Sequence, residues 1–339
     1  MDNIFNKKNC FKEIEGVASL LEYGNYDETP KPVVSIIMPV YKRPDTFIHS
    51  LKSAINQDFN FPYEIVVVDN YDGKGESPNL EVVKQMGAKN VMYYHNSKNL
   101  GMYGNWNRGI ELARAEFITY CHDDDLLLPN CLKRLMELQK IAGRKCILST
   151  WNTIDEKGNY IYQEVFPYHR CKGFMILRDH YNYTLYDQFL GSQGYGVGCL
   201  FNRQCMLDIG GYNIDYYPSA DYALHTCYTF HWGCIMNNVP TFNYRISLNE
   251  SFAIYKMFVE RDKFFRQCMM AKIKLPVWWL EMVDEAIFRI KKYQHTVQWG
   301  GEDSSLCRKI KRKDWFIFKL AMLYHNTKKY SVSFKINRG

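Results

Sequence analysis

The residues with the clearest chemical potential lie in one segment, FITYCHDDDLLLP, from Phe117 to Pro129. Its β-branched and aromatic start predicts a short strand, and Pro129 and Asn130 open a helix after it. Between the two stand three consecutive carboxylates, Asp123 to Asp125. Adjacent carboxylates repel one another, so we expect a neutralising partner, and a hard divalent cation that itself holds a phosphate is the simplest one. The alternative is a solvated acidic turn that caps the helix, and the pattern alone leaves both open.

Further polar side chains follow other predicted strands. Pro39 and Tyr41 come after VVSIIM, and Asp69 and Asn70 end EIVVVDN. Because ligands bind at the carboxyl ends of the strands in an open α/β sheet, we expect these residues to face the same crevice as the three aspartates. Asp221 precedes a predicted helix, where a carboxylate either favours the helix N-terminus through the dipole or is presented into the crevice.

The segments that carry these residues alternate between strand and helix patterns. The strands are continuous apolar runs, which are typical of a parallel sheet buried on both faces. Alternation with short links predicts such a sheet with right-handed crossovers. The predicted strands are 33–38, 64–69, 91–94, 117–121 and 146–151, and the last of them is expected to extend the same sheet. Four helices are predicted: one begins near 44, a short one ends at 86, and the other two span 106–115 and 131–141.

Weaker patterns flank this core. In residues 1–31 an apolar patch at 14–21 predicts a short helix, and 153–182 reads as an insertion or hairpin. The glycine-dense stretch 191–198 lacks the spacing of a phosphate-binding loop, so we interpret it as a strand or loop that another group approaches closely. Near the C-terminus, helices are predicted at 252–270 and 277–293, packed on the main domain rather than touching substrate.

Composition narrows the class of protein. The chain has 339 residues, 47% of them hydrophobic, which is enough for one large globular α/β domain or for a domain with a substantial appendage. Eleven cysteines without a CxxC pair, and no secretory signal, predict reduced thiols in the cytoplasm and no zinc site. No apolar run reaches the roughly 20 residues of a membrane-spanning helix.

Basic residues are concentrated at the end of the chain. Residues 308–339 hold ten Lys or Arg against one Asp, so this tail carries +9 while the chain as a whole carries +7. Basic residues beside Trp315 and Phe316 suit an anionic bilayer, so residues 308–324 predict peripheral binding at the inner face of the cell membrane. The alternative is a helix docked on the protein with a solvated basic face. Nucleic acid is not expected, because the crevice is acidic and no recognition motif is present.

Seven pieces of the sequence stand in a specific order: SIIMPVYKRPD, EIVVVDN, NLGMYGNWNRGIELARAEFITY, HDDDLLLP, IGGYN, SADYAL and YRISLNES. Together they resemble an inverting family-2 glycosyltransferase with the GT-A fold, which implies a Rossmann-like, mostly parallel sheet flanked by helices. We expect an N-terminal extension at 1–31, the catalytic domain at 32–251 and a helical, basic C-terminal region at 252–339.

The resemblance also implies roles for single residues. Asp221 matches the general base, and Asp124 with Asp125 would hold Mn²⁺ or Mg²⁺. Where the family often has a second aspartate that contacts uracil, this chain has Asn70, and where a D-x-D-D pattern begins it has His122. Where the family commonly has a histidine after the arginine of a late YR motif, this chain has Ile246 and Ser247 after Arg245. The nucleotide of the donor, a UDP-sugar, would bind Pro39, Tyr41, Asp69, Asn70 and Asp123.

The implied reaction moves one sugar from a nucleotide diphosphosugar to a hydroxyl of a glycan or a lipid-linked oligosaccharide in surface polysaccharide biosynthesis. A single base that is ionised at neutral pH suffices for such a transfer, whereas a glycoside hydrolase needs paired carboxylates. Two alternatives remain. One is a nucleotidyltransferase that makes an activated sugar. The other is a non-catalytic membrane scaffold whose site has decayed, which the changes at His122, Ala220 and Ser247 would favour.

Overall fold

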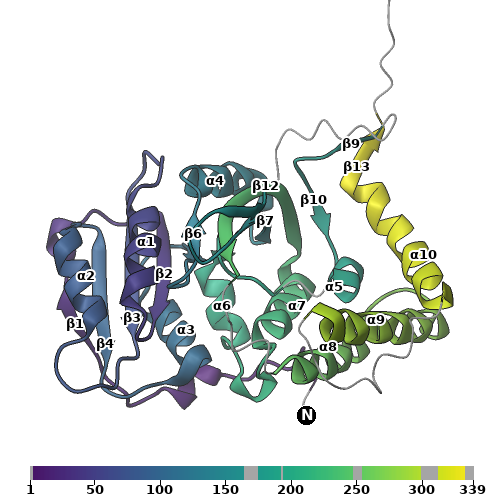
Figure 1. The fold of residues 1–339 in the computed structure, drawn as a ribbon, viewed down its shortest axis with the longest axis horizontal. Helices are drawn as coiled ribbons and strands as arrows, with labels where there is room; N and C mark the ends of the chain where they lie inside the picture. Colours follow the sequence, from purple (N-terminus) through teal and green to yellow (C-terminus); the bar gives the residue numbers. More distant parts are fainter. Residues whose placement is uncertain (1–2, 164–174, 192–193, 247–253, 299–311, 333–339) are drawn as a thin grey trace, which may run out of the picture.

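A computed structural model describes residues 3–163, 175–191, 194–246, 254–298 and 312–332 (Figure 1). Its larger sheet has six strands in the order β1-β4-β3-β2-β5-β11, of which the central four run parallel and the two edge strands antiparallel. The predicted α/β architecture is confirmed. These strands are β1 Ser19–Tyr23, β2 Val34–Val40, β3 Tyr63–Asp69, β4 Val91–Asn96, β5 Phe117–Tyr120 and β11 Phe201–Asn202.

The central strands are apolar on both faces because helices cover both. Every residue of β2 is buried, and successive side chains enter two different hydrophobic clusters. One cluster includes Phe47 and Leu51, and the other includes Tyr103 and Trp106. Phe47 and Leu51 lie on α1 Pro44–Ile55, and Tyr103 and Trp106 lie on α3 Gly101–Leu112. Two further helices are α2 Pro78–Met86, which packs beside α1, and α4 Cys131–Ala142, which contacts strands of the second sheet described below.

A second sheet corrects the prediction for residues 146–151. The strand there does not extend the larger sheet but pairs in parallel with β12, a twelve-residue strand that the sequence analysis did not predict. Asn237, Asn238 and Pro240 interrupt the apolar pattern of β12, and its pairing with β7 shifts register at the same place. The second sheet comprises β6 Leu126–Leu127, β7 Cys146–Ile154, β8 Tyr160–Tyr162, β10 His180–Tyr183 and β12 Cys234–Arg245.

Two further predictions differ from the structure. The patch at 14–21 forms no helix; instead β1 adds an edge strand beside β4, and the 3-10 turn η1 Cys10–Glu13 precedes it. Helix α3 begins at Gly101, five residues before the predicted start. Polar loop contacts hold its first residue: the amide of Asn70 donates to the carbonyl of Gly101, and the N–H of Gly101 donates to Asn99. The hairpin predicted within 153–182 is present as β7 and β8, although 164–174 lie outside the described residues.

The C-terminal helices join the core of the main domain, as predicted. Phe265, Met269, Leu280 and Val283 share one hydrophobic cluster with Tyr120 of the larger sheet. In the described residues no helix combines the length and the apolar character needed to cross a membrane, and no cysteine is paired. The remaining elements are η2 Tyr26–Glu28, α5 Leu185–Gly191, α6 Arg203–Ile209, η3 Ile214–Tyr216, α7 Ala220–Trp232, α8 Tyr255–Met270, α9 Val277–Gln298, α10 Arg312–Lys329, and the pair β9 Met175–Leu177 and β13 Tyr330–Val332.

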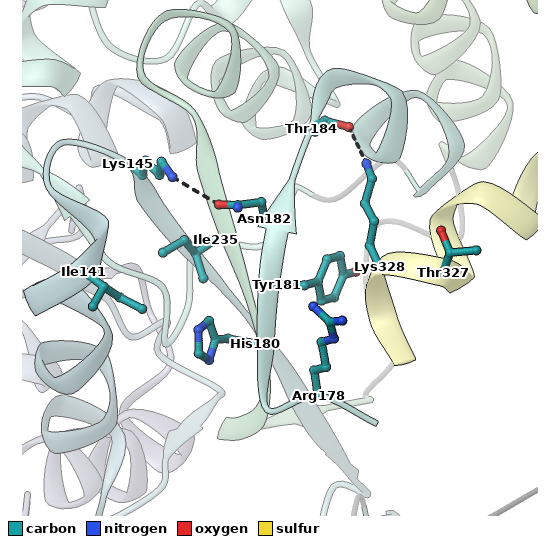
Figure 2. Close-up of a pocket in the computed structure, with 10 residues that line it drawn as sticks. All are labelled: Ile141, Lys145, Arg178, His180, Tyr181, Asn182, Thr184, Ile235, Thr327 and Lys328. Carbon is teal, nitrogen blue, oxygen red and sulfur yellow. Dashed lines mark hydrogen bonds between the residues drawn. The ribbon is translucent and has the colours of Figure 1, made fainter. Parts of the chain in front are cut away.

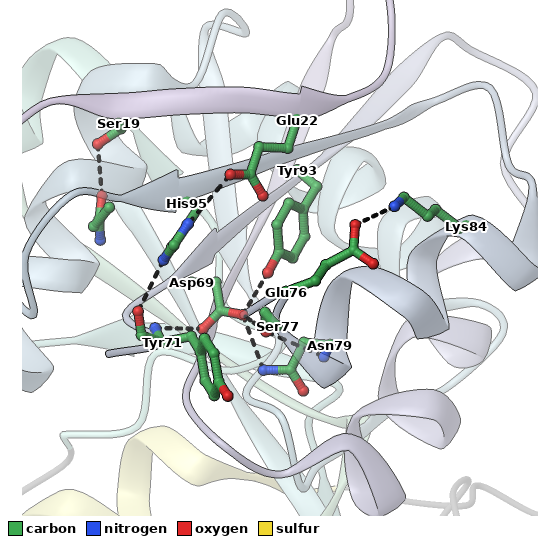
Figure 3. Close-up of polar contacts among 11 residues, drawn as sticks. Ser19, Glu22, Asp69, Tyr71, Glu76, Ser77, Asn79, Lys84, Tyr93 and His95 are labelled. Atoms are coloured by element: carbon green, nitrogen blue, oxygen red, sulfur yellow. Dashed lines mark hydrogen bonds and ion pairs between the residues drawn. The ribbon is translucent and has the colours of Figure 1, made fainter. Parts of the chain in front are cut away.

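Asp69, at the end of β3, organises the loop that follows it (Figure 3). Its carboxylate is fully buried and accepts four hydrogen bonds. Oδ1 accepts the backbone N–H of Tyr71 at 2.9 Å, and Oδ2 accepts the hydroxyl of Ser77 at 2.6 Å. Oδ2 also accepts the amide of Asn79 at 3.1 Å and the hydroxyl of Tyr93. The residue that the sequence analysis assigned to nucleotide binding is therefore occupied by protein donors that fix the β3–α2 loop.

We predict that Asp69→Asn destabilises the protein by about 2 kcal/mol, because an amide offers one acceptor where the carboxylate offers two and leaves a buried donor unpaired. Urea unfolding without nucleotide measures this loss. Glu76→Gln is the matched control, since Glu76 lies in the same loop, pairs with Lys84 and is exposed; it should leave the unfolding midpoint unchanged. Equal midpoints for Asp69→Asn and the wild type would contradict the structural role.

Candidate active site

A cleft of about 620 Å³ lies at the carboxyl ends of β2, β3 and β5. It brings together residues predicted from separate strand ends and from the helix that Asp221 opens. Asp69 is the exception, because it does not line the cleft. The predicted residues that do line it are Pro39, Tyr41, Asn70, Asp123, Asp124, Asp125 and Asp221.

The aspartate turn is held in shape by β12. The backbone N–H of Arg245 donates to Asp125 Oδ1 at 2.9 Å, and the Arg245 side chain donates to the carbonyl of Asp124 at 2.8 Å. The same guanidinium donates to the carbonyls of Asp155 and Glu156 at 3.0 and 2.7 Å. Arg245, on β12 of the second sheet, thus joins the aspartate turn to the β7–β8 hairpin through hydrogen bonds.

Burial and mutual repulsion make two of these carboxylates easier to protonate. Burial, with the nearby charge of Asp124, raises the pKa of Asp123 to about 7. The same two causes raise the pKa of Asp125 well above its ordinary value. Burial removes the water that would stabilise the charged carboxylates, and a bound cation would compensate for that loss.

His122 completes a set of side chains that could hold a metal. Its ring stacks on Trp106 at 4.9 Å between centroids, and Nδ1 lies 3.7 Å from Asp125 Oδ2. One potential ligand atom from each of His122, Asp124 and Asp125 lies within 4.8 Å of the others. Nε2 of His122 is buried and has no hydrogen-bond partner in the described part of the chain. Two carboxylates and an imidazole fit Mn²⁺ well and Mg²⁺ through the oxygens.

Asp221 lines the cleft from the second position of α7. It accepts the N–H of Tyr222 at 2.7 Å, so it both serves the helix N-terminus and lines the cleft. Burial raises its pKa to about 7, and the charge of Asp262 adds to the effect. The sequence analysis expected a base that is ionised at neutral pH, and a pKa of about 7 means that only part of the Asp221 carboxylate is ionised there.

The glycine-dense stretch lies against this carboxylate. A Cβ atom at Gly194 would stand 2.9 Å from Cγ of Asp221, closer than real Cβ contacts. The close approach predicted for residues 191–198 is confirmed at this position, and Tyr195 beside it also lines the cleft. A larger residue at 194 would push Asp221 out of place.

Asn70 uses its side chain to join the end of β3 to helix α3. Its amide donates to the carbonyl of Gly101 at 3.0 Å, and its oxygen accepts from Asn96 at 2.8 Å and from the N–H of Leu100 at 3.2 Å. Tyr41 remains 40% exposed at the mouth of the cleft. Of these two residues, Tyr41 therefore has the side chain that is more accessible to a ligand.

Sequence reasoning missed several residues of the cleft, among them two from α8 and one from the loop after β2. Phe258 and Asp262 come from α8, which was expected only to pack on the domain, and Asp262 is paired with Lys291 at 3.2 Å. No sequence signal separates Asp262 from a charge on a helix surface. Arg43 pairs with Asp124 at 3.0 Å; its place in the loop after β2, two residues beyond Tyr41, could have revealed it.

A second cavity of about 640 Å³ lies between β10, the end of α4 and the end of α10 (Figure 2). Within the described parts of the chain, its charged side chains are Lys145, Arg178 and Lys328, and none of the described carboxylates lines it. The figure shows Lys145 with Asn182 on one side of β10 and Lys328 with Thr184 on the other. Without a carboxylate this cavity offers neither a hard-metal ligand nor a carboxylate base, so we assign the chemistry to the aspartate cleft.

Comparison with known proteins places this arrangement in a family. Residues 35–204, half of the chain, match the family model "Glycosyl transferase family 2". An uncharacterized glycosyltransferase of Methanocaldococcus jannaschii is 31% identical over 40% of this chain and 47% of its own length. The GalNAc(5)-diNAcBac-PP-undecaprenol beta-1,3-glucosyltransferase of Campylobacter jejuni is 36% identical over 31% of this chain and 34% of its own. The chain thus spans half or less of these two relatives.

Solved structures share the fold at low identity. S. aureus TarS 1–349 in complex with UDP-GlcNAc has a TM-score of 0.52 and 13% identity, covering 90% of this chain and 98% of that one. The mannosyltransferase PcManGT from Pyrobaculum calidifontis, in complex with GDP-Man and Mn²⁺, has a TM-score of 0.52 and 11% identity, covering 93% and 92%. The family match and the shared GT-A fold agree with the cleft described above, and the chain belongs to glycosyl transferase family 2.

Proposed function

We propose that this protein is an inverting, metal-dependent glycosyltransferase that moves one sugar from a nucleotide diphosphosugar to a hydroxyl of a glycan or lipid-linked oligosaccharide. The observation that carries the proposal is that Asp221 lines the same cleft as the cluster of His122, Asp124 and Asp125. A transfer reaction needs a cation near the leaving diphosphate and a base near the incoming hydroxyl, and this cleft offers candidates for both.

Each group has one task in the mechanism. Asp124 and Asp125, with His122, would hold Mn²⁺ or Mg²⁺, and the bound ion would neutralise charge on the departing diphosphate. Asp221 accepts the proton of the acceptor hydroxyl as the new glycosidic bond forms. Because the acceptor attacks from the side opposite the leaving group in a single displacement, the anomeric configuration inverts. A pKa of about 7 leaves Asp221 partly ionised at neutral pH and matched to this proton transfer.

The donor is proposed to be a UDP-sugar bound along the ends of β2 and β3. Pro39, Tyr41 and Asn70 would line the base and ribose, with Asp123 beside them. The UDP-GlcNAc bound to TarS supports a uridine donor. The GDP-Man bound to PcManGT shows that the same fold accepts guanine, so GDP-sugars belong in every donor test.

A lipid-linked acceptor is supported by the name of the C. jejuni relative, which acts on an undecaprenol-linked glycan. In this chain Asp262 and Phe258 reach the cleft beside Asp221 and would contact the acceptor. The nucleotidyltransferase alternative loses its support with the family match. The other alternative, a non-catalytic scaffold with a decayed site, was suggested by changes at three residues. Of these, His122 lies among the metal-binding candidates, Ala220 is buried, and Ser247 lies outside the described residues.

We predict that Asp221→Asn lowers turnover by ~10² to 10⁴, because the variant has no base to take the hydroxyl proton. Turnover is the release of nucleoside diphosphate from a panel of UDP- and GDP-sugars, with Mn²⁺ or Mg²⁺ and with a membrane extract as the acceptor source. Asp45→Asn is the matched control, since Asp45 occupies the same position in helix α1 and is exposed. Nuclear magnetic resonance of the product reports its anomeric configuration. Full turnover by Asp221→Asn would refute the assignment of the base.

We also predict that turnover rises with pH through about 7. The folded pKa of Asp221 lies above its ordinary value, so the carboxylate is protonated and inactive as a base at pH 5.5 and ionised at pH 8. The profile of kcat/KM over this range measures the effect. Nucleotide binding at each pH is the control for the metal site, and a flat profile with constant binding would exclude Asp221 as the titrating base.

The C-terminal helix supports binding to an anionic membrane surface. Helix α10 docks through Ile317 and Ala321, so the docked-helix alternative is also realised. Its outer face leaves Phe316, Leu320 and Leu323 at helical spacing 67%, 44% and 59% exposed. The basic residues 308–313 adjoin this stripe in sequence, although 308–311 lie outside the described residues.

Replacing Phe316, Leu320 and Leu323 together by Ser should weaken binding to phosphatidylglycerol vesicles at least about tenfold, because three apolar side chains no longer enter the bilayer. Vesicle flotation measures the bound fraction, with phosphatidylcholine vesicles for comparison. A control variant with Phe61, Ile141 and Ile161 changed to Ser removes equally exposed apolar residues elsewhere. The same loss in both variants would argue against a dedicated surface on α10.

A further inference from the structure

Arg43 is the one Lys or Arg that lines the cleft within the described residues. Five carboxylates line the same cleft: Asp123, Asp124, Asp125, Asp221 and Asp262. A nucleotide diphosphate is itself an anion, so it cannot enter this cleft without cations to receive it. One metal ion neutralises only part of that charge. Arg43 is therefore the one Lys or Arg side chain that the described part of the cleft offers to the negative charge of the donor.

In the structure Arg43 is paired with the aspartate turn. Its Nη1 lies 3.0 Å from Asp124 Oδ2 and 3.7 Å from Asp123 Oδ1. Asp124 is also one of the three candidate metal ligands. A guanidinium and a divalent cation at the same carboxylate repel each other, so a metal bound by Asp124 weakens its pairing with Arg43.

The side chain has room to move when that pairing weakens. It is 48% exposed, and its residue lies in the loop just before Pro44 opens α1. A guanidinium binds two phosphate oxygens at once, a geometry that suits a diphosphate better than a single carboxylate.

We propose that Arg43 is a ligand of the donor diphosphate, held by Asp123 and Asp124 until a metal ion takes its place and releases it. The proposal rests on the proposed function. It adds that Arg43 and the metal compete for one carboxylate before the donor binds and bind the same diphosphate afterwards. Metal binding therefore prepares the site for the nucleotide in two ways, by its own charge and by freeing Arg43.

The test separates the two halves of this exchange with Arg43→Gln. Calorimetric titration with Mn²⁺ alone should show a few-fold tighter binding, because a competing ion pair of ordinary surface strength is gone. Titration with UDP or GDP at saturating Mn²⁺ should show binding weakened by about tenfold or more, the usual effect of losing hydrogen bonds to a charged group. Arg43→Lys should keep the competition with Mn²⁺ and recover only part of the nucleotide affinity.

Lys52→Gln is the control, since Lys52 is an exposed cation on the helix that Arg43 precedes and does not line the cleft. It should change neither titration. Unchanged Mn²⁺ affinity in Arg43→Gln, or unchanged nucleotide affinity, would overturn the proposal for Arg43 while leaving the transferase function intact. Failure of the wild-type protein to bind Mn²⁺ with any nucleotide would instead count against the proposed function, and the proposal for Arg43 would fall with it.

Discussion

The arrangement of the rest of the molecule depends on the repulsion among carboxylates that are crowded at one edge of the larger sheet. Like charges at short range destabilise the folded state unless protons, cations or hydrogen-bond donors compensate them. In this chain the compensation is distributed: Arg245 donates to the turn from β12, Arg43 pairs from the first loop, and Lys291 pairs with Asp262 from α9. The second sheet and the C-terminal helices are therefore needed to hold the acidic edge together, besides enlarging the core.

Much of the fold could be predicted because its parallel strands are buried on both faces. Continuous apolar runs gave β2, β3, β4 and β5 close to their observed bounds. The partner of β7 could not be predicted, since a run such as Cys146–Ile154 indicates burial but not which sheet it enters. Strand β12 was not predicted because asparagines and a proline interrupt its apolar pattern. The polar side chains find hydrogen-bond partners distant in sequence: Arg134, for example, donates to Asn237 at 3.0 Å.

The site was predictable where chemistry follows from strand ends, and less so where it depends on side-chain direction. Six of the residues expected at the edge of the sheet do line the cleft, and so does Asp221. Asp69 stands at the right strand end, yet its carboxylate is used by the loop beneath it. Whether a residue at such an edge meets ligand or backbone depends on which donors the next loop brings, and that is a property of the folded chain.

Helix α8 lies beyond the region that matches the family model, yet it lines the cleft next to Asp221. The chain therefore divides chemically along its length: the matched part carries the aspartate turn, while a later helix borders the space where an acceptor would lie. Exchange of that helix during evolution could redirect the same reaction toward a different hydroxyl without disturbing the bond-breaking machinery. Divergence among relatives should accordingly concentrate on the inward face of α8, where a few substitutions would change what the enzyme recognises.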